Sequence, residues 1–113
     1  MVDMTNLEIT KLCAEAMGFI TMKTVWDSRE QPGRDGYLAF HGSTSIGWYD
    51  PLHDDAQAMA LMKKCEIDVS CIYDDEGKHD GWMALSPKAE EVFSHDLNRA
   101  ICECVTKMQQ ARK

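Results

Sequence analysis

The chain is organised around the stretch SPKAEEVFSHDLNRAICECVTKMQQ, residues 86–110. Ser86 followed by Pro87 is typical of a helix start, because the hydroxyl caps free N–H groups and proline needs no N–H in the first turn. Apolar residues then recur every three or four positions, at 89, 92, 93, 97, 100, 101, 104, 105 and 108. This spacing predicts one amphipathic helix over 86–110 with a single apolar stripe, which must lie on the rest of the fold.

Two shorter helices are predicted upstream. Thr5 and Glu8 have the spacing of a capping box, and Gly18 suits the left-handed end of a helix over about 6–17. Asp54 and Asp55 place two carboxylates at the positive end of a second helix, over about 54–64, which closes on lysines.

Residues rich in β-formers, or alternating apolar and polar, lie between the helices. Strands are predicted over 19–26, 37–40, 67–73 and 82–85, with a brief extended segment at 46–49. Polar loops are expected at 27–36 and 42–47. The predicted order is α-β-β-α-β-β-α, and the predicted class is α+β: one domain over 1–113, with a mostly antiparallel sheet packed between helices.

Acidic residues dominate the charge. The chain has a formal charge of −7, and residues 50–80 alone hold nine acids against three lysines. Such a segment repels phosphate, so direct nucleic-acid binding is not expected, whereas a basic protein partner suits it. No apolar run reaches the roughly 18 residues of a membrane span, and no signal segment precedes the first helix, so a cytoplasmic protein is expected. The five cysteines then predict reduced thiols, with Cys13, Cys71 and Cys104 on apolar faces.

Two groups of residues are candidates for partner binding. The acidic group comprises Asp74, Asp75, Glu76 and Asp80 in a predicted turn, with Asp54 and Asp55 at the second helix. Clustered carboxylates also suit a divalent cation, but this spacing is not that of a helix-loop-helix calcium site. Trp48 and Tyr49 follow a glycine-containing loop and are candidate anchors if they are exposed, although core packing is the default role of such rings.

No motif predicts catalysis or a cofactor. The glycines do not form a phosphate-binding or dinucleotide-binding loop. Cys102 and Cys104 point about 200° apart on a helix, so the two thiols cannot share a zinc ion with His95. A zinc site that uses Cys65 or Cys71 from elsewhere in the chain stays an alternative, although idle thiols are favoured. The histidines His41, His53, His79 and His95 fall mostly in predicted loops, with no nucleophile at a telling spacing. We therefore expect no enzyme, while a site assembled only in space stays an alternative.

Three segments resemble a known family. TNLEITKLCAEAMG (5–18), WYDPLHDDAQAMALM (48–62) and GWMAL (81–85) resemble the phage ABA sandwich domain family, small single-domain proteins of bacteriophages and prophages. The resemblance spans most of the chain and implies a helix-sheet-helix layered fold. It carries over no catalytic residues.

Charge and resemblance together predict a phage-encoded accessory protein that binds a host protein. The sharper hypothesis is an inhibitor of a bacterial defence system, of anti-CRISPR or anti-restriction type, acting through an acidic surface. The alternatives are a structural or housekeeping phage protein that forms a homodimer without a host target, and a small metal-dependent enzyme.

Overall fold

The computed structural model describes residues 5–26, 34–87 and 89–111. Over this part, the chain forms α1 (Asn6–Met17), β1 (Ile20–Trp26), β2 (Arg34–His41), β3 (Thr44–Tyr49), α2 (Asp55–Cys65), β4 (Asp68–Tyr73), β5 (His79–Ser86), β6 (Ala89–Ser94) and α3 (Leu97–Ala111). Within the described part, no helix has both the length and the apolar character needed to span a bilayer.

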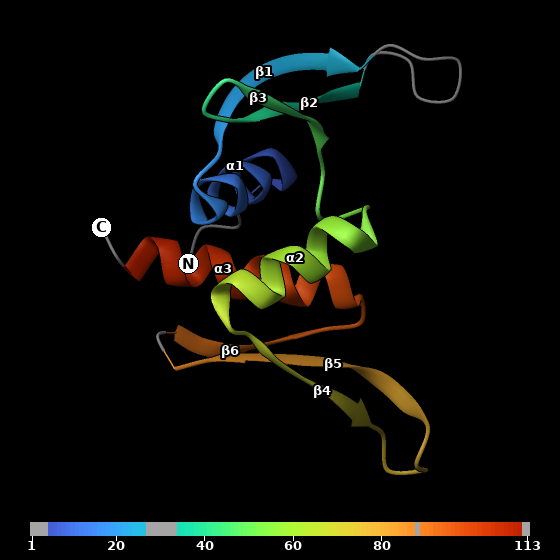
Figure 1. Cartoon of the computed structure of the whole chain (residues 1–113). Coiled ribbons are helices and arrows are strands. Elements are labelled where there is room, and N and C mark those ends of the chain that lie inside the picture. Colours follow the sequence, from blue (N-terminus) through green and yellow to red (C-terminus); the bar gives the residue numbers. More distant parts are fainter. Residues whose placement is uncertain (1–4, 27–33, 88, 112–113) are drawn as a thin grey trace.

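The helices lie between two sheets (Figure 1). In the described residues, β1-β2-β3 and β4-β5-β6 form separate three-stranded sheets in which each strand pairs antiparallel with the next. α1 packs on β1 and β2, α3 packs on β5 and β6, and the three helices contact one another. The predicted α+β class and antiparallel pairing are confirmed. The layers differ from the expected helix-sheet-helix order, because the sheets are outside and the helices are in the middle.

Helices α1 and α2 confirm the two shorter helical predictions. The Thr5 hydroxyl accepts from the Glu8 N–H at 3.1 Å, and Gly18 ends α1 with a φ of 81°. Asp54 caps α2 by accepting from the Gln57 N–H at 3.0 Å. Local capping alone places both helix starts, which is why sequence spacing located them.

The predicted helix over 86–110 is wrong in its first third. Residues 89–94 form β6, which pairs with β5, and Ser86 is the register partner of Ala89 across the connection. Pro87 therefore lies in a turn between strands. The N-terminal cap of α3 is Asp96, whose carboxylate accepts from the Arg99 N–H at 3.0 Å. Val92 fits an amphipathic helix as well as a strand, and only its pairing with Ala84 distinguishes the two.

The strand predictions hold apart from their ends. The brief extended segment at 46–49 belongs to β3, which also includes residues 44–47 of the loop predicted at 42–47. Residues 34–36 of the loop predicted at 27–36 belong to β2. Residues 27–33 of that loop lie outside the described residues. His41 and His79, expected in loops, lie at the ends of β2 and β5.

The core is shared by both sheets and all three described helices. α3 lies centrally and is buried on several sides, so that Cys102 and Cys104 are both fully buried although they point in different directions. Leu61 and Ile101 are also fully buried, and each such side chain contributes about 1.5–3 kcal/mol through its removal from water. The predicted burial of Cys13 and Cys104 is confirmed, but Cys71 is exposed.

Candidate functional site

The acidic candidates form two separate groups. Asp54 and Asp55 lie at the start of α2, level with the helical layer, whereas Asp74, Asp75 and Glu76 lie in the turn between β4 and β5 (Figure 1). This turn projects from the lower end of the molecule, beyond the helices. The six carboxylates therefore do not form one surface.

The carboxylates at α2 are engaged in the scaffold. Asp54 caps the helix, and Asp55 Oδ1 accepts a 2.8 Å hydrogen bond from Asn98 Nδ2 of α3. Both aspartates are exposed, but their oxygens already hold α2 in place. In the described structure, Asp54 caps α2 and Asp55 ties α2 to α3, so both carboxylates have a structural role.

The β4–β5 turn presents its charges differently. Asp74 Oδ1 accepts from the backbone N–H groups of Glu76 and Lys78, both at 2.9 Å, and so orders the turn. Asp75 and Glu76 are exposed, and the Glu76 carboxylate lies 3.8 Å from Lys78 Nζ. Asp80 accepts through its backbone oxygen from His95 Nδ1 at 2.8 Å. A hydrogen-bonded turn thus carries carboxylates that face solvent.

Neither aromatic candidate has the exposed side chain that a surface anchor needs. Tyr49 is 2% exposed, so it cannot serve as a surface anchor in this structure. Trp48 is half-buried, and its ring occupies the space in which a side chain at Gly36 would lie. Tyr49 therefore packs in the core, which is the default role of such a ring.

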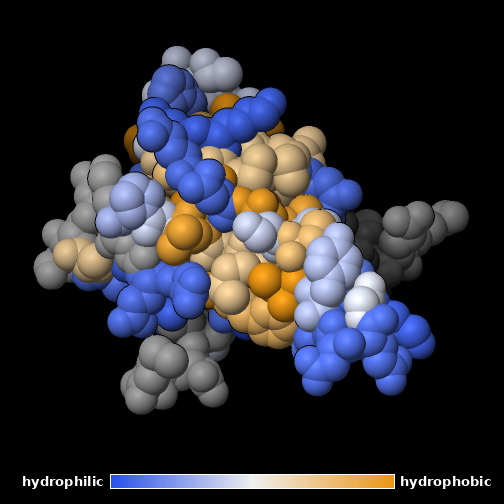
Figure 2. Space-filling model, turned by 90° about the horizontal axis from the view of Figure 1, so that it is seen from below, coloured by the Kyte–Doolittle hydropathy of each residue, from blue (hydrophilic) through white to orange (hydrophobic). Residues whose placement is uncertain are grey.

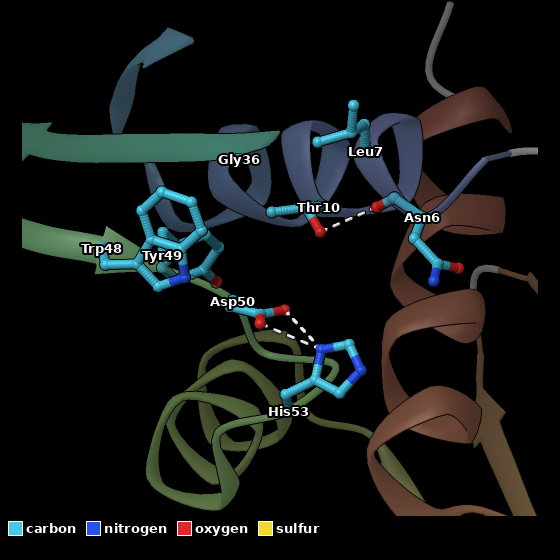
Figure 3. A pocket seen from close by; sticks show the side chains of 8 residues that line it. All are labelled: Asn6, Leu7, Thr10, Gly36, Trp48, Tyr49, Asp50 and His53. Atoms are coloured by element: carbon cyan, nitrogen blue, oxygen red, sulfur yellow. Dashed lines mark hydrogen bonds and ion pairs between the residues drawn. The ribbon is translucent and has the colours of Figure 1, made fainter. Parts of the chain in front are cut away.

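Next to these aromatics lies a pocket of about 210 Å³. Figure 3 shows its lining residues, which come from α1, from β2, from the end of β3 and from the turn before α2. The lining residues are Asn6, Leu7, Thr10, Gly36, Trp48, Tyr49, Asp50 and His53. Most of the lining residues belong to two segments that resemble the ABA sandwich family, 5–18 and 48–62. These two segments therefore lie close together in space.

The pocket contains a paired carboxylate and imidazole. His53 Nδ1 lies 2.9 Å from Asp50 Oδ2 and 3.1 Å from Asp50 Oδ1 (Figure 3). Because a carboxylate only accepts, this contact assigns the ring proton to Nδ1 and leaves Nε2 as an acceptor in the neutral ring. The His53 side chain is 58% exposed, whereas that of Asp50 is 12% exposed. Such a pair can orient a general base.

Gln57 links α2 to the end of β3 through two hydrogen bonds. Gln57 Nε2 donates to the Trp48 backbone oxygen at 2.9 Å, and Gln57 Oε1 accepts from the Asp50 N–H at 2.6 Å. The Gln57 side chain thus forms hydrogen bonds with backbone groups at the end of β3 rather than with the helix-cap residue Asp54. The hydroxyl of Thr10, on the opposite wall, donates to the Asn6 backbone oxygen at 2.8 Å.

Two buried thiols and the Tyr49 hydroxyl have a raised pKa. Cys13 Sγ donates to the Cys102 backbone oxygen at 3.6 Å. A side-chain hydrogen bond with Cys102, together with burial, raises the pKa of Cys13, and burial raises the pKa of Cys104 and of Tyr49. These shifts keep the groups neutral and unreactive. Among the described residues, no three His, Cys, Asp or Glu side chains are placed to hold a metal ion.

Sequence reasoning missed the Asp50–His53 pair. The signal was present in the segment Asp50-Pro51-Leu52-His53, because a proline after aspartate favours a turn that brings positions one and four together. The turn is indeed closed by the His53 N–H, which donates to the Asp50 backbone oxygen at 3.0 Å.

Comparisons with known proteins show the fold. No family model matches the sequence, and no curated protein matches it. Among solved structures, the chain is similar to a phage protein from Bacillus cereus ATCC 14579, whose crystal structure was determined at 2.0 Å. The TM-score is 0.56 at 20% sequence identity, and the match covers 96% of this chain and 95% of that chain. The likeness thus extends over nearly the whole fold, while the ABA sandwich family itself is not confirmed.

Proposed function

We propose that this chain is a phage- or prophage-encoded accessory protein that acts by binding a host protein. The likeness of its fold to a phage protein supports the origin. The observation that carries the binding role is the hydrogen-bonded β4–β5 turn, which holds the exposed carboxylates of Asp75 and Glu76 beyond the helical layer (Figure 1).

The sharper form of the proposal is inhibition of a bacterial defence complex that handles nucleic acid. Such complexes bind DNA or RNA through lysine and arginine side chains. An acidic projection competes for those same cations and so excludes the nucleic acid. This mode of action requires no catalytic residue on the inhibitor.

Affinity capture from lysate of bacteria with intact defence systems tests the proposal. The baits are the wild-type chain, an Asp75→Lys variant and a Glu15→Lys variant, which reverses an exposed charge on α1. We leave Asp74 unchanged because it orders the turn. We expect capture of one nucleic-acid-handling complex by the wild type and by Glu15→Lys, with a loss for Asp75→Lys and at high salt. Recovery of the bait alone from every lysate contradicts the proposal.

The Asp50–His53 pair favours one second candidate, a small enzyme that uses His53 as a general base in the adjacent pocket. Thermal shifts with nucleotides and divalent ions distinguish it from a binding protein. A ligand that raises the melting temperature of the wild type, but not that of His53→Gln, supports this candidate. Equal shifts in both proteins contradict it.

A further inference from the structure

The register of the second sheet places apolar side chains on its outer face. Residues paired directly across antiparallel strands share a face, and neighbours along a strand alternate. Ala84 and Val92 are paired and buried in the core, so Met83 and its partner Phe93 face outward. By the same alternation, the outer face holds Ile72, Met83, Leu85 and Phe93. We call these four side chains the outer apolar face.

Figure 2 views this face directly and shows hydrophobic residues gathered at its centre, with hydrophilic residues around them. Leu85 is 45% exposed and Phe93 is 42% exposed. The Phe93 ring packs over Gly81, where a Cβ would lie 2.7 Å from Phe93 Cζ.

Acidic residues border the outer apolar face at both ends. Asp68 is the register partner of Leu85, and Glu91 lies on β6 next to Phe93, at one end of the sheet. The Asp75 and Glu76 turn lies at the other end. Residues 66–96 contain nine acids and two lysines, a formal charge of −7 that equals that of the whole chain. The rest of the chain is neutral in total.

The charge and the area of the outer apolar face restrict which partners can bind to it. A second copy would bring two such acidic sheets together, and like charges across an interface oppose association. The strands β4, β5 and β6 have six, eight and six residues. Three strands of at least six residues span roughly 14 Å by roughly 20 Å, or about 300 Å². A stable interface needs about 800 Å² per partner, so a partner must also contact the acidic ends.

We propose that the outer apolar face, with its acidic ends, docks a basic protein surface that presents apolar side chains between its cations. The proposal rests on the proposed function and names the surface and the partner chemistry for it. The apolar centre forms a contact from which water is excluded. The acidic residues attract basic partners to the face and repel acidic ones.

The first sheet offers a matched control. Its exposed apolar residues Ile20 and Met22 are 65% and 52% exposed, at least as much as Leu85 and Phe93. This sheet belongs to the part of the chain whose charges cancel. Variants of the first sheet therefore test whether exposed apolar side chains bind the partner when no concentrated charge surrounds them.

Fluorescence anisotropy with labelled peptides tests the partner chemistry. The probe is a short peptide that alternates leucine with lysine. Its controls replace leucine with serine, which keeps the charge, or lysine with glutamate, which keeps the apolar residues. We expect binding of the leucine–lysine peptide that weakens as salt rises from about 0.05 M to about 0.5 M. We also expect binding about tenfold weaker for the serine–lysine peptide, and none for the leucine–glutamate peptide.

Paired variants then locate the site. Leu85→Ser/Phe93→Ser should weaken the leucine–lysine peptide about tenfold, whereas Ile20→Ser/Met22→Ser should bind it as the wild type does. Amide chemical-shift mapping on the wild-type protein gives the same test without any substitution, and we expect shifts on β5 and β6. Shifts confined to β1–β3, equal losses in both variants, or binding of the leucine–glutamate peptide overturn the proposal. A dimer that Phe93→Ser dissociates also overturns it, because a second copy then covers the face.

The two proposals fail separately. If wild type and Leu85→Ser/Phe93→Ser capture the same host protein equally well, the docking surface is wrong while the proposed function stands. If the leucine–lysine peptide binds the outer apolar face as expected but no host protein is captured, the proposed function fails while the surface chemistry stands.

Discussion

Asp55 at the start of α2 accepts a 2.8 Å hydrogen bond from the side-chain amide of Asn98 on α3. The two residues are 43 positions apart in the sequence, and Asn98 is only 8% exposed. This contact ties the second helix to the third. It also explains why a carboxylate that the sequence offered as a partner contact belongs to the scaffold.

Asp55→Ala should lower the free energy of unfolding by about 1–2 kcal/mol, because it leaves the buried Asn98 amide without this charged acceptor. Urea unfolding measures the change. The matched control is Asp75→Ala, which removes an exposed carboxylate from the β4–β5 turn and should change stability by less than about 0.5 kcal/mol. Equal effects of the two substitutions would contradict the scaffold role of Asp55.

Tyr49→Phe should leave stability unchanged or raise it by about 1 kcal/mol. Among the described residues, the Tyr49 hydroxyl is buried without a hydrogen-bond partner, and burying an unsatisfied hydroxyl is costly. The ring itself packs edge-on against Phe19, with 5.6 Å between centroids, and stays in place. Thermal and urea unfolding test this. A loss above about 1 kcal/mol would mean that the hydroxyl is satisfied in solution.

Gly36→Ala should destabilise the protein by about 1–3 kcal/mol, because the added Cβ collides with the Trp48 ring. The cost should shrink when Trp48 is first replaced with alanine, since the collision partner is then gone. A double-mutant cycle with urea unfolding measures this coupling. Additive effects of the two substitutions would place the cost of Gly36→Ala elsewhere.

Glu66→Gly should raise the free energy of unfolding by about 0.5–1 kcal/mol. Glu66 ends α2 with a φ of 55°, a left-handed conformation that costs less for glycine. Gly18 ends α1 with a φ of 81°, and a Cβ there meets nothing within 4 Å. Gly18→Ala should therefore cost about 1 kcal/mol for backbone reasons alone. Opposite signs for the two substitutions in urea unfolding are the expected result, and equal signs would refute it.

Stability should fall as the pH rises above about 9. The side-chain hydrogen bond of Cys13 with Cys102, and the burial of Cys13 and Cys104, raise the pKa of both thiols above their ordinary value of 9.0. Below pH 9 both the folded and the unfolded states hold these protons. Above it the unfolded chain releases protons that the folded protein retains, so each thiol lowers the free energy of unfolding by about 1.4 kcal/mol per pH unit.

Urea midpoints between pH 7 and pH 10 measure this slope. Cys104→Ala should reduce it, and Cys71→Ser, at an exposed thiol, should leave it unchanged. A slope that Cys104→Ala does not alter would show that another group causes the loss of stability.

Much of the fold was predictable because local interactions encode it. The starts of α1 and α2 depend on caps within four residues, Thr5 with Glu8 and Asp54 with Gln57. The candidate site was less predictable. The Asp50–His53 pair sits in one turn, but the pocket beside it needs α1, β2 and β3 to converge. The exposure of Cys71 and the burial of Tyr49, which packs against Phe19, likewise depend on tertiary packing.

By itself, the sequence determined the α+β class, two of the helices and the strand centres, because capping, periodicity and β-propensity act over a few residues. Only the tertiary structure decided that residues 89–94 form a strand, because Val92 and Phe93 suit either conformation until β5 offers them partners in Ala84 and Met83. It also decided that the strands form two outer sheets, since sheet membership depends on pairings between distant strands. The outer apolar face, bordered by acidic residues at both ends of the sheet, is a consequence of that choice.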